Sequence, residues 1–201
     1  MTSTTVIAVM AHPDDAEIWA GGTLARYARQ GCAAILVGTT DEMRRREAIA
    51  GAEVLGAQLH LVKKVSVSSV INLIDELNAD VLICHRWDDP HPDHRRIGML
   101  VTGAVQKAAI GRSKRIRLYV SDTYQSLTLD GSVSGRSIVN IDETFELKIR
   151  ALRHHKSQPI DHFAEMASRQ AGFWGARIGA TWGEAFDPVP VLGVLPEATM
   201  L

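Results

Sequence analysis

The sequence predicts an α/β fold: a single-domain, Rossmann-like, mostly parallel and twisted sheet with helices on both faces. Short runs rich in Val and Ile alternate with longer segments of helical spacing over about the first 125 residues. Strands separated by helices of this length require right-handed crossovers, and therefore a parallel sheet. The chain has 201 residues, 46% of them hydrophobic, which suits one globular domain over residues 1–201.

The first part of the chain supplies most of the sheet. Each apolar run is followed by a segment in which apolar side chains recur on one helical face, such as Leu24, Tyr27 and Ala28. Gly31 and Gly56 are expected to end the first two helices. We expect strands at 6–10, 33–40, 59–62, 80–85 and 115–122, and helices at 22–30, 44–56, 67–79 and 94–109.

The pattern changes after residue 130. We expect a loop at 131–137, a short strand at 137–141, and helices at 142–157 and 161–179, with Asp142 as the N-cap of the first helix. The proline-rich segment 187–196 is too short for a linker, and we interpret it as a tail.

Composition limits the classes of partner. The 22 basic and 23 acidic residues nearly balance, so no general attraction to nucleic acid or to a membrane surface is expected. No apolar run approaches the ~20 residues needed to cross a bilayer. Cys32 and Cys84 lie in apolar segments and fit free thiols in a reducing compartment. These features predict a cytoplasmic protein and leave homo-oligomerisation open.

Two acidic, histidine-rich loops follow the first and fourth predicted strands. The first, "HPDDAE", begins at His12, and the second, "HRWDDPHPDH", ends at His94. Parallel strands deliver such loops to the same sheet edge, where ligands of open α/β sheets bind. Pro13 and Pro92 each stand between a histidine and an aspartate and stiffen the turn.

The side chains of these loops match a catalytic zinc site, which commonly uses imidazole and carboxylate ligands and keeps one position for water. Spacing alone does not choose among His12, His91 and His94, or between Asp14 and Asp15. Neighbouring aspartates in one turn must point in different directions, so one can bind metal while the other acts as a base. Solvated charges at a helix start are the alternative for one such motif, and two motifs on one edge favour the metal.

The segments "AHPDDAEIWAGGTLA" and "HPDHRRIG" resemble the PIG-L/LmbE-like family of zinc-dependent N-deacetylases. The likeness continues through "RRREAIAGAEVLG", "KIRALRHHKSQ" and "GEAF", and so extends over nearly the whole chain. The resemblance implies an LmbE-like fold and the removal of an acyl group from an amine.

The resemblance also implies roles for individual residues. His12, Asp15 and His94 match the family's zinc ligands, and Asp14 matches its general base. His91 matches a histidine that stabilises or protonates the tetrahedral intermediate, and Asp93 matches the carboxylate that orients this imidazole.

Three features depart from the family pattern. Trp19 stands where relatives often have glycine, and it can narrow the pocket, stack on a substrate or simply join the core. Arg44, in the run that ends at Arg46, can reach an anionic substrate group or pair with neighbouring glutamates. Asp89 occupies a position where some relatives have a tyrosine that contributes to the oxyanion pocket. We therefore treat Trp19, Arg44 and Asp89 as candidate substrate-binding residues.

The sequence as a whole predicts a metal-dependent hydrolase that removes an N-acyl group, most simply acetyl, from a small amino sugar, glycoside or nucleoside-like metabolite. The expected cofactor is Zn²⁺, although Fe²⁺ or Co²⁺ fits the same ligands. The expected partner is a small N-acylated molecule, with no nucleic acid and no membrane. The alternatives are an amidase of a larger conjugate and a non-catalytic metabolite-binding module on the same fold.

Overall fold

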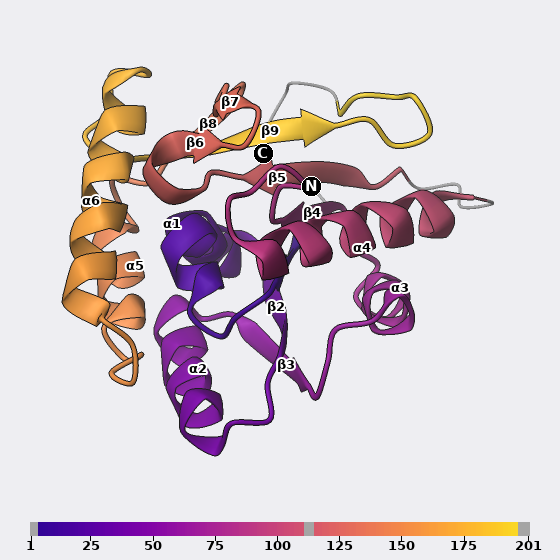
Figure 1. Ribbon diagram of the computed structural model, residues 1–201, viewed down its shortest axis with the longest axis horizontal. Helices are drawn as coiled ribbons and strands as arrows, with labels where there is room; N and C mark the ends of the chain where they lie inside the picture. Colours follow the sequence, from indigo (N-terminus) through magenta and orange to yellow (C-terminus); the bar gives the residue numbers. More distant parts are fainter. Residues whose placement is uncertain (1–3, 111–114, 197–201) are drawn as a thin grey trace.

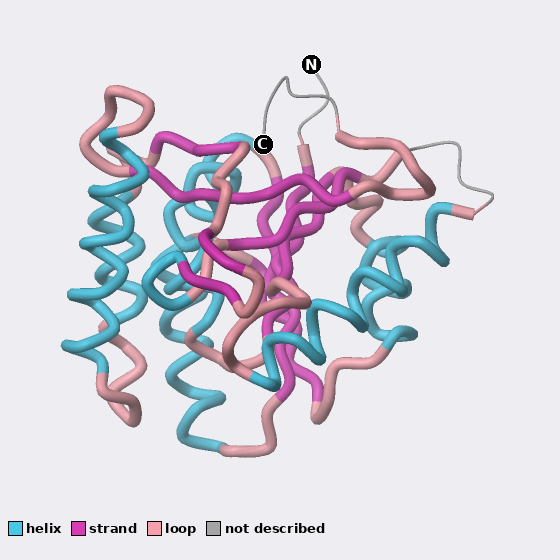
Figure 2. The backbone as a smooth tube through the Cα atoms, turned by 45° about the horizontal axis from the view of Figure 1, so that its top comes forward, coloured by secondary structure: helices cyan, strands magenta, loops and turns pink. Residues whose placement is uncertain are grey.

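The computed structural model describes residues 4–110 and 115–196. A seven-stranded sheet lies between two layers of helices (Figures 1 and 2). The strands are β1 (Thr5–Met10), β2 (Cys32–Gly38), β3 (Gln58–Val62), β4 (Val81–Cys84), β5 (Arg117–Ser121), β8 (Ser137–Asn140) and β9 (Gly183–Val189). The helices are α1 (Asp15–Gln30), α2 (Glu42–Leu55), α3 (Val67–Glu76), α4 (Pro92–Ala109), α5 (Phe145–Leu152) and α6 (Ile160–Ala176). A short 3₁₀ turn, η1 (Tyr124–Ser126), leads into the small hairpin of β6 (Leu127–Thr128) and β7 (Gly131–Ser132).

The sheet confirms the predicted α/β class. Its strand order is β3-β2-β1-β4-β5-β9-β8, and the first five of these strands are parallel. One apolar core lies between the sheet and α1, α2 and α5, and a second lies between the opposite face and α3 and α4. Figure 2 shows these two helical layers on either side of the sheet. In the layer of α1, helix α5 packs on α1 and α2, and α6 packs on β9. The expected mostly parallel sheet with helices on both faces is therefore correct.

The C-terminal part differs from the prediction in β9 and in the two-residue strand β7, which begins the segment expected as a loop. The segment interpreted as the start of a tail forms the second half of β9, which lies antiparallel between β5 and β8. Pro188 pairs with Tyr119 inside this strand. Proline normally argues against an interior strand because it has no N–H to donate, and this is why the sequence pattern hid β9.

Helix boundaries show two further corrections. The first helix begins at Asp15, seven residues before the expected start, because the acidic turn itself is helical. Asp142 is not the N-cap of α5; Thr144 holds that position. The Asp142 carboxylate instead accepts a hydrogen bond of 2.7 Å from the amide of Trp182, next to β9. Gly56 does end α2, with a left-handed φ of 72° that favours glycine.

Among residues 4–110 and 115–196, no helix has the length and apolarity needed to span a membrane.

Candidate active site

The two acidic loops meet because β1 and β4 are adjacent parallel strands, with Val9 paired to Cys84. From β1 the chain proceeds outward to β2 and β3, whereas β4 and β5 extend the sheet in the other direction. This reversal is the topological switch point at which open α/β sheets bind ligands. The amide of Ala11 donates a 3.1 Å hydrogen bond to Nε2 of His85 and joins the loops directly.

The neighbouring aspartates point in different directions, as the sequence required. Asp15 faces the histidines: one carboxylate oxygen accepts a 2.7 Å hydrogen bond from the His12 amide and lies 3.2 Å from His12 Nδ1. Its other oxygen lies 3.3 Å from Nε2 of His94. Asp14 instead accepts a 2.6 Å hydrogen bond from Nη2 of Arg44.

The electrostatics of the two carboxyl groups also differ. Burial raises the pKa of Asp15, but the neighbouring His85 and His94 outweigh this effect and hold it well below its ordinary value. Burial and then the charge of Asp15 raise the pKa of Asp14. Arg44 opposes this rise and so favours the anionic form of Asp14.

His94 is fully buried between two carboxylates. Its Nδ1 lies 3.2 Å from Asp89, and its Nε2 faces Asp15. Neither ring nitrogen makes a well-aligned hydrogen bond, so Nε2 is a buried polar atom that a metal ion would satisfy. A carboxylate behind a ligating imidazole is a frequent arrangement in metal sites. Asp89 thus lies against His94, at a place suited to orienting that ring.

Among the described residues, two groups of side chains lie close enough to hold a cation, His12–His91–His94 and Asp15–His85–His94. The expected ligands His12, Asp15 and His94 do not form one of these groups but are shared between them; their donor chemistry fits zinc, and Asp15 lies 3.2 Å from His12 Nδ1 and 3.3 Å from His94 Nε2. In the second group the rings of His85 and His94 are stacked, with centroids 3.8 Å apart and planes inclined by 10°. Stacked rings do not direct their lone pairs to one point, so this group is a poor site for a single ion.

His91 occupies the N-cap of α4, where its Nδ1 accepts a 3.2 Å hydrogen bond from the backbone amide of Asp93. This bond assigns the proton of the neutral ring to Nε2, which is then a hydrogen-bond donor. Burial and the nearby His94 and His12 lower the pKa of His91 and favour this neutral form. The Asp93 side chain is 48% exposed and lies 3.6 Å from His12 Nε2 and 3.4 Å from Arg96. The backbone of Asp93, rather than its carboxylate, therefore contacts His91.

The three candidate substrate-binding residues lie around this centre. Arg44 is bound to Asp14, Asp89 lies behind His94, and Trp19 is buried with 3% of its surface exposed. The edge-to-face contact between Trp19 and His94 has a centroid distance of 6.5 Å. The indole therefore belongs to the core and also lies next to the candidate ligands.

Sequence reasoning missed Tyr124. Its ring stacks on His94 at 5.8 Å and meets Trp19 edge-to-face at 5.2 Å. Burial and the charges of Asp15, Asp89 and Asp14 raise its pKa, so the phenol stays protonated. The available signal was its position in "SDTYQS" directly after β5, at the same sheet edge as the acidic loops.

A second group lies behind Asp14. His155 and Glu17 are both buried, and their side chains approach to 3.3 Å. The backbone of α2 is very close, because a Cβ at Gly51 would collide with the Glu17 carboxylate. When protonated, His155 opposes the rise in the pKa of Asp14, as Arg44 does.

A buried ion pair supports α1 from the opposite side. Nζ of Lys148 donates to the Ile18 carbonyl at 2.7 Å and to Glu184 at 2.6 Å. The Glu184 carboxylate accepts the amides of Gly22 at 2.9 Å and Thr23 at 2.8 Å. In an undisturbed α-helix these amides bond to carbonyls four residues earlier. The side chains of this ion pair therefore form hydrogen bonds with backbone groups of α1 just beyond the acidic turn.

The fold and the site together define an α/β enzyme with a cluster of His and Asp side chains compatible with a metal ion, and known proteins share these features. Residues 7–105 match the family described as "PIG-L: GlcNAc-PI de-N-acetylase". This match confirms the resemblance found in the two motifs. This region contains both acidic loops.

Individual relatives support the same family. The chain is 28% identical over 185 residues to a diacetylchitobiose deacetylase from Thermococcus kodakarensis, covering 76% of this chain and 69% of the relative. It also resembles the solved N,N'-diacetylchitobiose deacetylase from Pyrococcus horikoshii, with a TM-score of 0.74 and 25% identity, covering 94% of this chain and 85% of the other.

A third similar structure has another activity. The 4-carboxy-2-hydroxymuconate hydratase GalB from Pseudomonas putida KT2440 has a TM-score of 0.80 and 19% identity, covering 98% of this chain and 99% of that chain. This likeness establishes the shared fold alone. The chemistry must therefore be argued from the site.

Proposed function

We propose that the chain is a zinc-dependent N-deacetylase that hydrolyses the acyl amide of a small N-acetylated amino sugar, glycoside or nucleoside-like metabolite. The observation that carries the proposal is the division of the paired aspartates: Asp15 faces His12 and His94, and Asp14 turns to Arg44. The named diacetylchitobiose deacetylases among the relatives favour an acetylated amino sugar as the first substrate to try.

His12, Asp15 and His94 would hold the zinc ion. When bound, zinc supplies a Lewis acid that acidifies water and polarises the acyl oxygen. Asp14 accepts the proton of the attacking water, since Arg44 and His155 favour its anionic form. Arg44 engages one of its carboxylate oxygens, and the other is the candidate proton acceptor.

His91 would act on the oxygen of the reacting carbonyl group. Its neutral ring carries the proton on Nε2 and can donate a hydrogen bond to the developing oxyanion. The amine then leaves with a proton from Asp14 or His91. Tyr124 lies beside the same centre, but its hydroxyl has no assigned role in this scheme.

The experiment combines metal analysis with a screen for acetate release. We expect purified protein to contain about one zinc ion per chain for a single three-ligand site, and to release acetate from N-acetylglucosamine or diacetylchitobiose. Removal of zinc with a chelator should abolish the release, and added zinc should restore it. Protein that holds zinc, releases no carboxylate from any N-acylated compound and instead adds water to an unsaturated acid would contradict the proposal.

A further inference from the structure

We infer that Trp19 is a specificity-determining residue that limits the acyl group of the substrate to two carbons. The inference rests on the proposed function, because it concerns the acyl side of the same site. It combines a large aromatic side chain beside the acidic turn with the closed wall and the cavity that the structure places around this side chain.

The site has one open side and one closed side. His12 and His91 are partly exposed and Asp93 is nearly half-exposed, so a substrate enters from their direction. Asp15 and His94 are buried. The larger amine part of the substrate must remain on the open side, and the carbons beyond the carbonyl must extend toward the closed side.

Trp19 and Tyr124 form the closed wall beside His94. Their rings meet edge-to-face at 5.2 Å, and each also contacts the His94 ring. Trp19 is held on its other sides by Ile18, Leu152 and the side chains of α6. Displacing the indole into these neighbours to admit an additional methylene would overpack the core, which costs about 1–3 kcal/mol.

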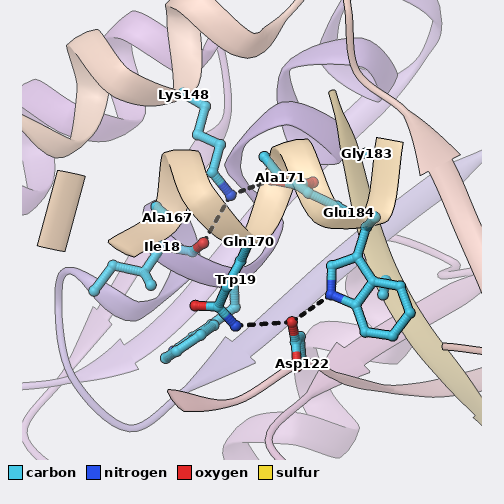
Figure 3. A pocket seen from close by; sticks show the side chains of 11 residues that line it. Ile18, Trp19, Asp122, Lys148, Ala167, Gln170, Ala171, Gly183 and Glu184 are labelled. Atoms are coloured by element: carbon cyan, nitrogen blue, oxygen red, sulfur yellow. Dashed lines mark hydrogen bonds and ion pairs between the residues drawn. The ribbon is translucent and has the colours of Figure 1, made fainter. Parts of the chain in front are cut away.

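A small cavity lies directly behind the indole. It is bounded by Trp19, Ile18, and residues of α6 and β9, with a volume of about 20 Å³, enough for about one water molecule (Figure 3). Its polar lining includes Lys148, Glu184 and Gln170. Trp19 Nε1 and Gln170 Oε1 are both buried and lack hydrogen-bond partners, which suits a bridging water.

Trp19 therefore separates the candidate metal centre from this cavity. Figure 3 shows the indole and the Gln170 amide side by side, with the Lys148 side chain farther from the indole. Loss of the indole would extend this cavity toward His94. The enlarged space would then accept an acyl chain that the original side chain excludes.

The first test measures kcat/KM of the zinc-loaded protein for N-acetyl-, N-propionyl- and N-butyrylglucosamine. A methylene in a closed apolar pocket changes kcat/KM by roughly 10–200-fold, so we expect at least a tenfold fall for each added methylene. In Trp19→Ala the propionyl and butyryl compounds should become the better substrates. Trp19→Phe retains an aromatic core residue and should give an intermediate preference if the alanine variant folds poorly.

Trp182→Ala is the matched control. This indole is also partly buried and stacks on Phe145 at 3.8 Å, but it does not line the cavity. We expect it to leave the order of acyl preference unchanged. The inference is overturned if the wild type accepts the butyryl compound within a few-fold of the acetyl compound. It is also overturned if Trp19 variants change the preference among amines and leave the preference among acyl groups unaltered.

A binding measurement separates this inference from the proposed function. Titration of acetate, propionate and butyrate into the zinc-loaded protein by calorimetry requires no turnover. Wild type should bind acetate most tightly, and Trp19→Ala should reverse the order. The reversal without hydrolysis of any N-acyl compound would refute the proposed deacetylase and retain the acyl-sized pocket. The same order in both proteins would refute the pocket.

Discussion

The buried Lys148–Glu184 pair should stabilise the fold through the segment of α1 that follows the acidic turn. Both side chains are 3% exposed, so the charges are removed from water. Replacing Lys148 with Met leaves Glu184 charged and buried and removes the donor to the Ile18 carbonyl. Removal of one partner of a buried ion pair costs about 3–5 kcal/mol.

This cost can be converted into a melting temperature. An unfolding entropy of about 2.1 cal/mol/K per residue gives about 0.42 kcal/mol/K for the 201-residue chain. We therefore expect Lys148→Met to lower Tm by about 7–12 °C in scanning calorimetry. Arg169→Met is the control, because its pair with Glu165 is exposed on both sides and should contribute less than about 1 kcal/mol.

Urea unfolding should give the same difference in the free energy of unfolding. A loss below about 1 kcal/mol for Lys148→Met, or a loss equal to that of the control, would refute the reasoning. It would mean that the amides of α1 find other partners when the ion pair is absent.

Three further predictions follow from the site and from β9. His91→Ala should retain zinc by metal analysis and lose mainly kcat, whereas loss of zinc would make His91 a ligand. Arg44→Gln should move the acidic limb of the kcat/KM profile to higher pH, because the charge of Arg44 opposes the rise in the pKa of Asp14. A higher KM with no movement of this limb would instead make Arg44 a substrate contact. Burial raises the pKa of Asp187, but the Arg136 amide and then Arg86 outweigh it, so its pKa lies below the ordinary value. The ionised Asp187 carboxylate therefore contributes its full stability above about pH 4, and this contribution is lost as the pH falls through the pKa of the folded state. Asp187→Asn should make the free energy of unfolding depend less on pH in this acidic range. An unchanged pH dependence would contradict this.

Local patterns in the sequence predicted the parallel half of the fold. Runs such as 6–10 and 80–85 are apolar on both faces, and the structure places them as adjacent central strands. The strand β9 escaped prediction because Asp187 and Pro188 interrupt its apolar pattern. Its two strand partners, which make that position favourable, are distant in the sequence.

The candidate site shows the same division between local and distant information. The two His-Pro-Asp motifs place their own residues, and the structure brings both together beside His94. The partners of these residues come from elsewhere: Arg44 from α2, Tyr124 from η1 and His155 from the segment after α5. Their contacts with the motif residues arise only in the tertiary fold, so spacing in the sequence does not determine these contacts.

Asp14→Asn tests the central claim, the division of labour between the paired aspartates, most directly. The substitution preserves the size of the side chain and removes the proton acceptor. It leaves the side chains of the candidate ligands His12, Asp15 and His94 unchanged. Zinc content and kcat should be measured on the same preparation. The account predicts zinc near the wild-type level and a fall in kcat of about 10²–10⁴-fold. A variant that holds zinc and turns over its substrate within a few-fold of wild type would contradict it.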